Sequence, residues 1–105
     1  MEETVTTYQF TQEDFDSFIK GFQENNSLPE GHLIIVLQSD AKLSKAELSV
    51  LKKVARKLQR EKKSFVLVNT ALTYDEVGEG LNVCPTLQEA RDLIEMENIE
   101  RDLWT

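Results

Sequence analysis

Residues 32–37 read His-Leu-Ile-Ile-Val-Leu, an apolar run that follows Gly31 and ends at the polar pair Gln38 and Ser39. A run of this length between turn-forming and polar residues is typical of a strand that is buried on both faces. Residues 65–68, Phe-Val-Leu-Val, have the same character. Strands of this kind occur in parallel sheets that helices cover on both sides. The two runs therefore predict adjacent strands at the centre of an α/β domain.

Two helices are expected around the first of these strands. Before it, residues 5–10 have the β-branched and aromatic composition of a strand, and Thr11 is a suitable N-cap for a helix. The apolar residues of that helix recur at helical spacing: Phe15, Phe18, Ile19 and Phe22. After the strand, Ser44 and Glu47 form a capping box that opens a second helix. We expect its core side to carry Leu48, Leu51, Ala55 and Leu58.

The C-terminal part of the chain contains a last strand and a last helix. Residues 82–84 form a brief strand that Pro85 ends, and Thr86 with Glu89 forms a second capping box. We expect the inner face of this helix to carry Leu87, Ala90, Leu93 and Ile94, in a stripe that continues through Met96, Ile99 and Leu103 toward Trp104. Residues 71–80 leave room for one short helical turn around residues 74–77.

Strands and helices therefore alternate as four βα units within a single domain, residues 1–105. Parallel strands need crossover connections, which the intervening helices supply, and such crossovers are right-handed. The predicted fold class is α/β, with a mostly parallel four-stranded sheet flanked by helices.

The composition restricts the classes of function. The chain has 105 residues, a net charge of −7 and one cysteine, Cys84, which excludes an internal disulfide and a cysteine-based metal cluster. We expect no secretion signal and no membrane insertion, because no apolar run is long enough to span a bilayer. A cytoplasmic location follows from the same expectation. The negative charge opposes binding to nucleic acid or to anionic membranes.

Three segments resemble the STAS domain, the fold of anti-sigma-factor antagonists and of sulphate-transporter tails. Residues 33–37 are similar to the central strand of that family, and residues 64–69, Ser-Phe-Val-Leu-Val-Asn, to its next strand. Residues 85–90, Pro-Thr-Leu-Gln-Glu-Ala, are similar to the start of its last helix. The resemblance implies a fourfold βα fold and a regulatory module that binds other proteins. The family usually opens with two strands, whereas only one fits before the first helix of this chain.

The resemblance also identifies a candidate partner surface. In the family a phosphorylation switch, Asp-Ser-Ser-Gly, opens the helix after the central strand, and kinase-like partners bind there. Residues 44–47, Ser-Lys-Ala-Glu, align with this motif, so a residue without a hydroxyl, Ala46, occupies the phospho-acceptor position. The implied partner-binding residues are Ser39, Asp40, Lys42, Ser44, Lys45, Ala46 and Ser49.

Residues 81–103 also resemble small bacterial STAS-like proteins of uncertain role, some of which carry a ribonuclease Z label. Such nucleases bind two metal ions through several histidines, whereas this chain has only His32. We therefore expect no hydrolase activity, no bound metal and no cofactor.

The other candidate sites have structural interpretations. We interpret Cys84 as a buried structural cysteine, His32 as a surface or strand-end residue, and Ser44 as a helix cap rather than a phosphorylation site. The basic residues between Lys52 and Lys63 are interpreted as a solvated helix face, with docking to an acidic protein surface as the alternative. The last helix is rich in carboxylates, but the sequence has no loop with the spacing of cation ligands. The end of this helix, Leu103 and Trp104, either folds back on the core or contacts a partner.

These observations favour a non-catalytic STAS-like module that binds another protein, either a regulatory kinase-like partner or an accessory protein. The alternative is a homo-oligomeric structural or accessory protein. In that case a dimer would pair the basic second helix of one copy with the acidic last helix of another.

Overall fold

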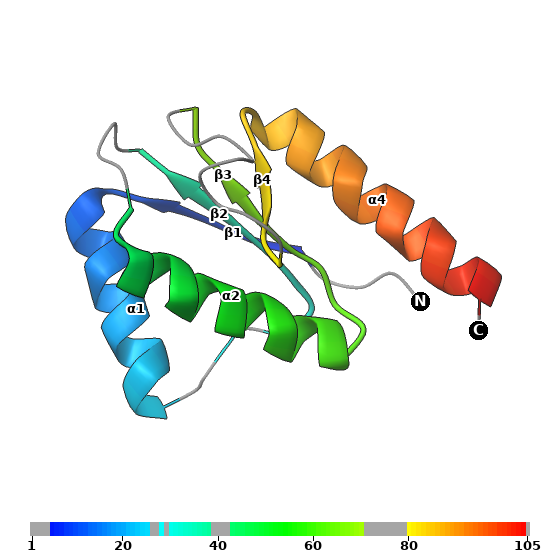
Figure 1. The fold of residues 1–105 in the computed structure, drawn as a ribbon. Helices are drawn as coiled ribbons and strands as arrows, with labels where there is room; N and C mark the ends of the chain where they lie inside the picture. Colours follow the sequence, from blue (N-terminus) through cyan, green and yellow to red (C-terminus); the bar gives the residue numbers. More distant parts are fainter. Residues whose placement is uncertain (1–4, 26–27, 29, 39–42, 71–79, 105) are drawn as a thin grey trace.

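A computed structural model describes residues 5–25, 28, 30–38, 43–70 and 80–104, and only the backbone of Trp104 (Figure 1). Its strands are β1 (Val5–Phe10), β2 (His32–Leu37), β3 (Phe65–Val68) and β4 (Asn82–Cys84). The helices of the described residues are α1 (Gln12–Asn25), α2 (Lys45–Arg60) and α4 (Leu87–Trp104). The helical turn expected around residues 74–77 lies outside the described residues.

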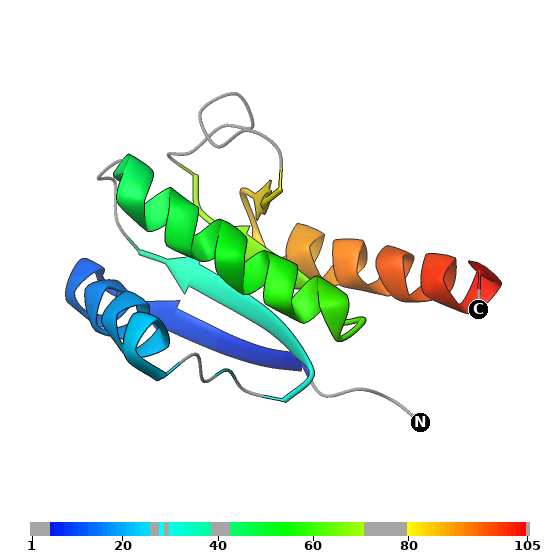
Figure 2. The ribbon, with the colours of Figure 1, turned by 60° about the horizontal axis from the view of Figure 1, so that its bottom comes forward.

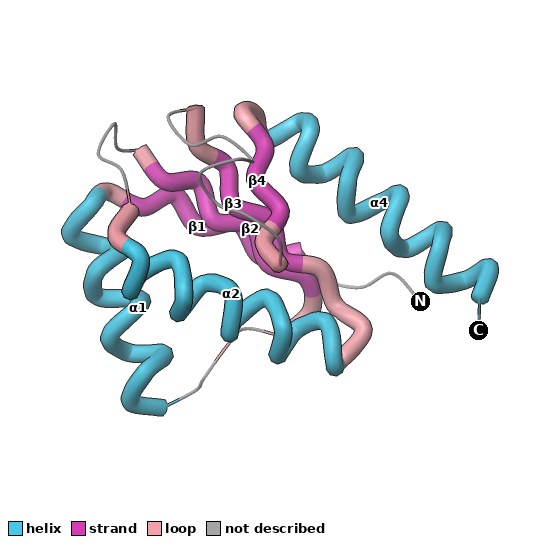
Figure 3. Tube along the Cα trace, in the orientation of Figure 1, coloured by secondary structure: helices cyan, strands magenta, loops and turns pink. Residues whose placement is uncertain are grey.

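The four strands lie side by side in one sheet (Figure 3). Their order is β1-β2-β3-β4, and each neighbouring pair is parallel. The two apolar runs pair directly, with Leu33 opposite Phe65 and Val36 opposite Val68. All residues of β2 and β3 are buried except Val36, which is half-buried. The prediction of an α/β fold with these two strands adjacent at its centre is confirmed.

Alternate residues of the sheet face two separate cores. The core on one face packs Leu33, Ile35 and Leu37 against α1 and α2. The core on the other face consists of Ile34, Val66, Val68, Ala90 and Ile94. Each strand lies beyond its predecessor in the same direction, so crossovers of one hand place α1 and α2 on the same face. Helix α4 follows the last strand and covers the opposite face, across β3 and β4 (Figures 1 and 2).

Each of the described helices α1, α2 and α4 begins at its predicted N-cap. The hydroxyl groups of Thr11, Ser44 and Thr86 accept hydrogen bonds from the amide three residues further along the chain, at 3.3, 3.1 and 3.2 Å. These bonds satisfy amide groups that have no acceptor within the helix. Local sequence therefore sets where each helix begins.

The C-terminal end of α2 closes in a Schellman motif. The Lys63 amide donates to the Leu58 carbonyl, and the Lys62 amide donates to the Gln59 carbonyl. This geometry places Lys62 in the left-handed region, at φ 61°. Glycine is the usual residue at this position because a Cβ atom is strained there.

The buried side of α2 differs from the predicted one. The buried residues are Val50, Leu51, Val54 and Leu58. Leu48 and Ala55, also expected on the core side, are half-buried and pack against the margin of that core. The predicted line omitted the β-branched residues Val50 and Val54. The sheet contacts a wider stripe of the helix than a single line of residues, so both valines reach it.

Candidate functional site

The predicted partner surface lies at the start of α2, the next described helix after β2. Ser44, Lys45, Ala46 and Ser49 are exposed on the first turns of the helix. The other three predicted residues, Ser39, Asp40 and Lys42, lie outside the described residues. The described members form an accessible and mostly polar surface at the carboxyl edge of the sheet.

Ser44 is engaged in a complete capping box. Its hydroxyl accepts from the Glu47 amide, and its own amide donates to Glu47 Oε1 at 3.0 Å. The Gln12 side chain donates to Glu47 Oε2 at 3.5 Å, which joins the first turns of α1 and α2. The geometry therefore identifies Ser44 and Glu47 as helix-capping residues.

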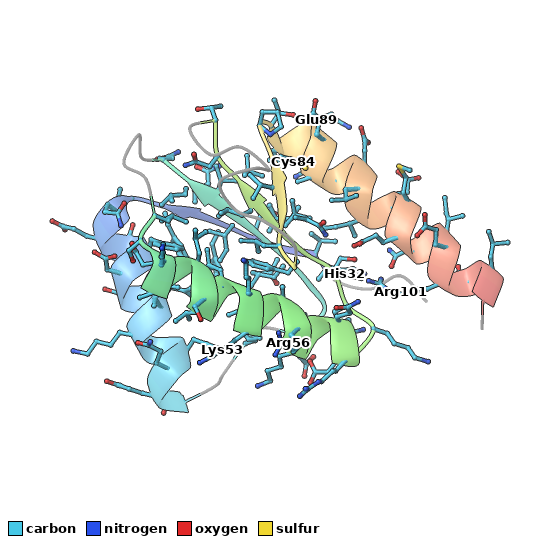
Figure 4. The ribbon with its side chains drawn as sticks, in the orientation of Figure 1. His32, Lys53, Arg56, Cys84, Glu89 and Arg101 are labelled. Carbon is cyan, nitrogen blue, oxygen red and sulfur yellow. The ribbon has the colours of Figure 1, made fainter. Side chains whose placement is uncertain are left out.

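Cys84 was expected to be buried, but it lies half-buried at the carboxyl edge of the sheet. Asn69, 4% exposed, holds this edge: its amide donates to the Cys84 carbonyl and its side chain donates to the Leu37 carbonyl. Burial, and secondarily the charge of Glu89, raises the pKa of the Cys84 thiol. A raised pKa reduces the thiolate fraction and makes a poor nucleophile. His32 begins β2 at the opposite end of the sheet, so the two residues cannot form a catalytic pair (Figure 4).

His32 is fully buried, which corrects the expectation of a surface histidine, although it does lie at a strand end. The Ser64 amide donates to His32 Nδ1 at 2.8 Å. A ring nitrogen that accepts a hydrogen bond carries no proton, so the neutral ring has its proton on Nε2. Here the imidazole provides a buried acceptor that joins the start of β2 to the start of β3.

Arg101 extends this polar group to α4. Its Nη2 donates to the Ser64 hydroxyl at 2.8 Å and its Nη1 donates to Asn98 Oδ1 at 3.0 Å. Glu97 Oε1 lies 3.9 Å from Arg101 Nη2 (Figure 4 shows Arg101 beside His32). The sequence interpretation did not identify this network. The sequence contained one indication of this network. Arg101 lies seven residues, about two helical turns, after the buried Ile94, and therefore on the same side of α4.

A hollow of about 580 Å³, lined by both polar and apolar groups, adjoins this network at the amino edge of β3 and β4. Its charged and amide side chains come from α2, α4 and the strand starts: Gln59, Lys63, Asn82, Glu97, Glu100 and Arg101. Side chains of both signs of charge line the hollow. The Ser64 hydroxyl accepts from Arg101, while His32 contacts the Ser64 backbone, so this serine and histidine are not arranged as nucleophile and base. The hydrogen bond from Arg101 of α4 to Ser64, at the start of β3, holds α4 against the sheet.

The basic residues of α2 lie on the side away from the sheet. Lys53, Arg56 and Arg60 are exposed, while Lys52 and Lys57 are half-buried. Lys53 and Arg56 extend away from the sheet (Figure 4). This distribution agrees with the interpretation of a solvated helix face.

The outward face of α4 is apolar, and this face was misplaced in the sequence interpretation. Met96, Ile99 and Leu103 are 58%, 55% and 75% exposed, so the predicted inner stripe does not continue through them. The sheet side of the helix follows Ala90 and Ile94 to Arg101 instead. The outward stripe, defined as Met96, Ile99 and Leu103, is surrounded by exposed carboxylates: Asp92, Glu95, Glu100 and Asp102.

Leu103 therefore does not fold back on the core, whereas the side chain of Trp104 lies outside the described residues. No helix among the described ranges combines the length and the hydropathy that crossing a membrane requires. Within residues 5–25, 28, 30–38, 43–70 and 80–104, no group of three or more His, Cys, Asp or Glu side chains could hold a metal ion. Neither a protein-family model nor a curated protein matches this chain.

Proposed function

We propose that this protein is a non-catalytic, STAS-like module that binds another protein and lacks the phospho-serine switch of that family. The observation that carries the proposal is the outward stripe of α4. A cytoplasmic location and a regulatory or accessory role belong to the same proposal. The parallel four-stranded sheet with its flanking helices supports it, because this arrangement is compatible with the four βα units that the resemblance implies.

The outward stripe contributes little to folding, because its side chains lie opposite the face that contacts the sheet. Single exposed apolar residues are common, but three on one helical line form a contiguous patch. Complete burial of Met96, Ile99 and Leu103 by a partner would add about 3–5 kcal/mol to binding, given about 1.5–3 kcal/mol for each fully buried side chain and their present partial burial. Such a patch is a suitable centre for a protein interface.

The carboxylates around the stripe define the chemistry of the partner. They favour a surface with apolar side chains at its centre and Lys or Arg at its rim. The stripes of two copies would instead bring like charges together. The outward face of α2 is basic but presents no apolar stripe. Another protein therefore satisfies the outward stripe better than a second copy does.

The start of α2 is the surface that the STAS resemblance implies, and it lies on the other side of the sheet from α4. Two matched variants separate these surfaces: Ile99→Glu places a charge in the outward stripe, and Ala46→Glu places one at the start of α2. Both positions are exposed, so both variants should keep the fold.

The test is affinity capture with the tagged chain from cells that make it, followed by mass spectrometry and a direct titration with the purified partner. We expect a stoichiometric partner whose affinity falls at least about tenfold with Ile99→Glu and weakens with added salt. If only Ala46→Glu abolishes partner binding, the interface lies at the start of α2. If both variants bind the partner as tightly as the wild type, neither surface is the interface. Absence of a stoichiometric partner would refute the binding function.

A further inference from the structure

Strand β1 lies at an edge of the sheet. Among the described residues it pairs only with β2, with Val5 opposite His32 and Phe10 opposite Leu37. Its sequence, Val-Thr-Thr-Tyr-Gln-Phe, is β-branched or aromatic except for Gln9. Edge strands of monomeric proteins are usually protected by Lys, Pro or a bulge, because an open edge can pair with another chain. Strand β1 contains no charged residue and no proline.

The pairing with β2 shows which backbone groups of β1 point outward. The Phe10 carbonyl accepts from the Gln38 amide at 2.8 Å. In a parallel pair, alternate residues direct both their N–H and C=O groups to the same neighbour. Thr6 and Tyr8 therefore share the inward direction of Phe10. The amides and carbonyls of Val5, Thr7 and Gln9 point to the open edge.

Partly exposed apolar groups lie on both sides of this edge. On the α1 side, the Tyr8 and Phe10 rings stack at 5.1 Å, and Phe18 lies 5.5 Å from Phe10. These half-buried rings, with Leu28, line a hollow of about 650 Å³. On the other side, Val5 is 41% exposed, since α4 contacts β2, β3 and β4. An added strand would cover apolar surface as well as backbone groups.

We propose that two copies of the chain pair through β1, antiparallel about a two-fold axis at Thr7, to form one continuous sheet across the dimer. In this register Thr7 exchanges both backbone hydrogen bonds with Thr7 of the second copy. Val5 exchanges its bonds with Gln9 of the second copy, and Gln9 with Val5. Every outward amide and carbonyl of β1 then has a partner.

A second copy fits this edge because the strand is complementary to itself. Its outward groups are spaced symmetrically about Thr7, and no charged side chain of one strand opposes a like charge on the other. On the α1 side, Thr6 lies across from Tyr8 of the second copy, a β-branched and aromatic pair of the kind that stabilises antiparallel strands. This interface is isologous and closes as a dimer. It leaves the outward stripe of α4 available.

The test compares Thr7→Pro with Thr7→Val in sedimentation equilibrium from about 1 µM to 1 mM. Proline removes an outward amide and no bond of the β1–β2 ladder, so an edge strand should accept it. We expect the wild type and Thr7→Val to dimerise and Thr7→Pro to remain monomeric, with a dissociation constant raised at least about tenfold. Salt should strengthen the dimer, because each copy has a net charge of −7.

Hydrogen exchange of the wild type provides a second readout that does not depend on the folding of Thr7→Pro. The amides of Val5, Thr7 and Gln9 should become protected as concentration rises, while those of Tyr8 and Phe10 are protected at every concentration. A wild type that stays monomeric, or outward amides that exchange freely at 1 mM, would overturn the proposal. A dimer that Thr7→Pro leaves intact would also overturn it. The same holds if β1 pairs only with peptides of other proteins and not with a second copy. The Ile99→Glu variant should dimerise normally, which separates this test from that of the partner surface.

Discussion

Replacing Ser44 with alanine tests whether this residue is only a cap of α2. The substitution removes the acceptor of the Glu47 amide, a 3.1 Å hydrogen bond, but leaves the Ser44 amide bonded to Glu47 Oε1. One of the two hydrogen bonds of the capping box is therefore lost. An N-cap serine contributes about 1 kcal/mol, so the free energy of unfolding should fall by about that amount. In a domain of this size such a change lowers Tm by about 4–8 °C.

The assay is urea and thermal unfolding followed by far-UV circular dichroism. Ser44→Asp should recover most of the loss, because aspartate also caps and its charge suits the positive end of the helix. Ser49→Ala is the matched control. Ser49 is exposed within the same helix but caps nothing, so its replacement should be neutral or stabilise by about 0.5 kcal/mol.

Two results would refute the interpretation of Ser44 as a cap. One is a Ser44→Ala variant as stable as the wild type. The other is a folded Ser44→Asp variant with altered partner affinity, as expected of a residue that is regulated by phosphorylation. The intact mass of protein isolated from its own cells across growth conditions gives an independent measurement. A stoichiometric phosphate on Ser44 that appears and disappears would replace the constitutive cap with a switch.

Three other predictions follow from buried or strained groups. His32→Leu should lower the free energy of unfolding by about 1–3 kcal/mol, because the buried Ser64 amide loses its acceptor; His32→Gln should recover part of this in urea titrations, and an unchanged midpoint for His32→Leu would contradict the assignment. Lys62→Gly should stabilise by about 1 kcal/mol by relieving left-handed strain, measured as a raised Tm, and no increase would argue against the Schellman geometry. Cys84 should react with a thiol reagent more slowly in the folded chain than in urea at the same pH, because its pKa is raised by burial and by Glu89. The stability contributed by the Cys84 thiol is complete below its pKa in the unfolded chain and is lost as pH rises through its raised pKa in the folded chain. The free energy of unfolding should therefore decline at alkaline pH in the wild type, and this decline should be absent in Cys84→Ala.

Local sequence was sufficient for the features that depend on neighbouring residues. Hydroxyl residues at Thr11, Ser44 and Thr86 predicted the helix starts, because each cap bonds an amide only three residues away. The continuous apolar runs of β2 and β3 predicted central strands, because a strand that is covered on both faces carries apolar residues on both sides. The parallel α/β fold followed, since alternating strands and helices leave few other arrangements.

The rotation of each helix and the contacts between distant residues depended on tertiary packing. Met96 fits an apolar stripe in the sequence, but the position of the sheet leaves Met96 exposed and places the charged Arg101 on the inner side of α4. The bond between His32 and Ser64 forms because parallel pairing brings the starts of β2 and β3 together. The open groups of β1 likewise follow from its place at the edge of the sheet. A linear pattern shows which residues are apolar, whereas burial and hydrogen bonding depend on what the completed fold places opposite them.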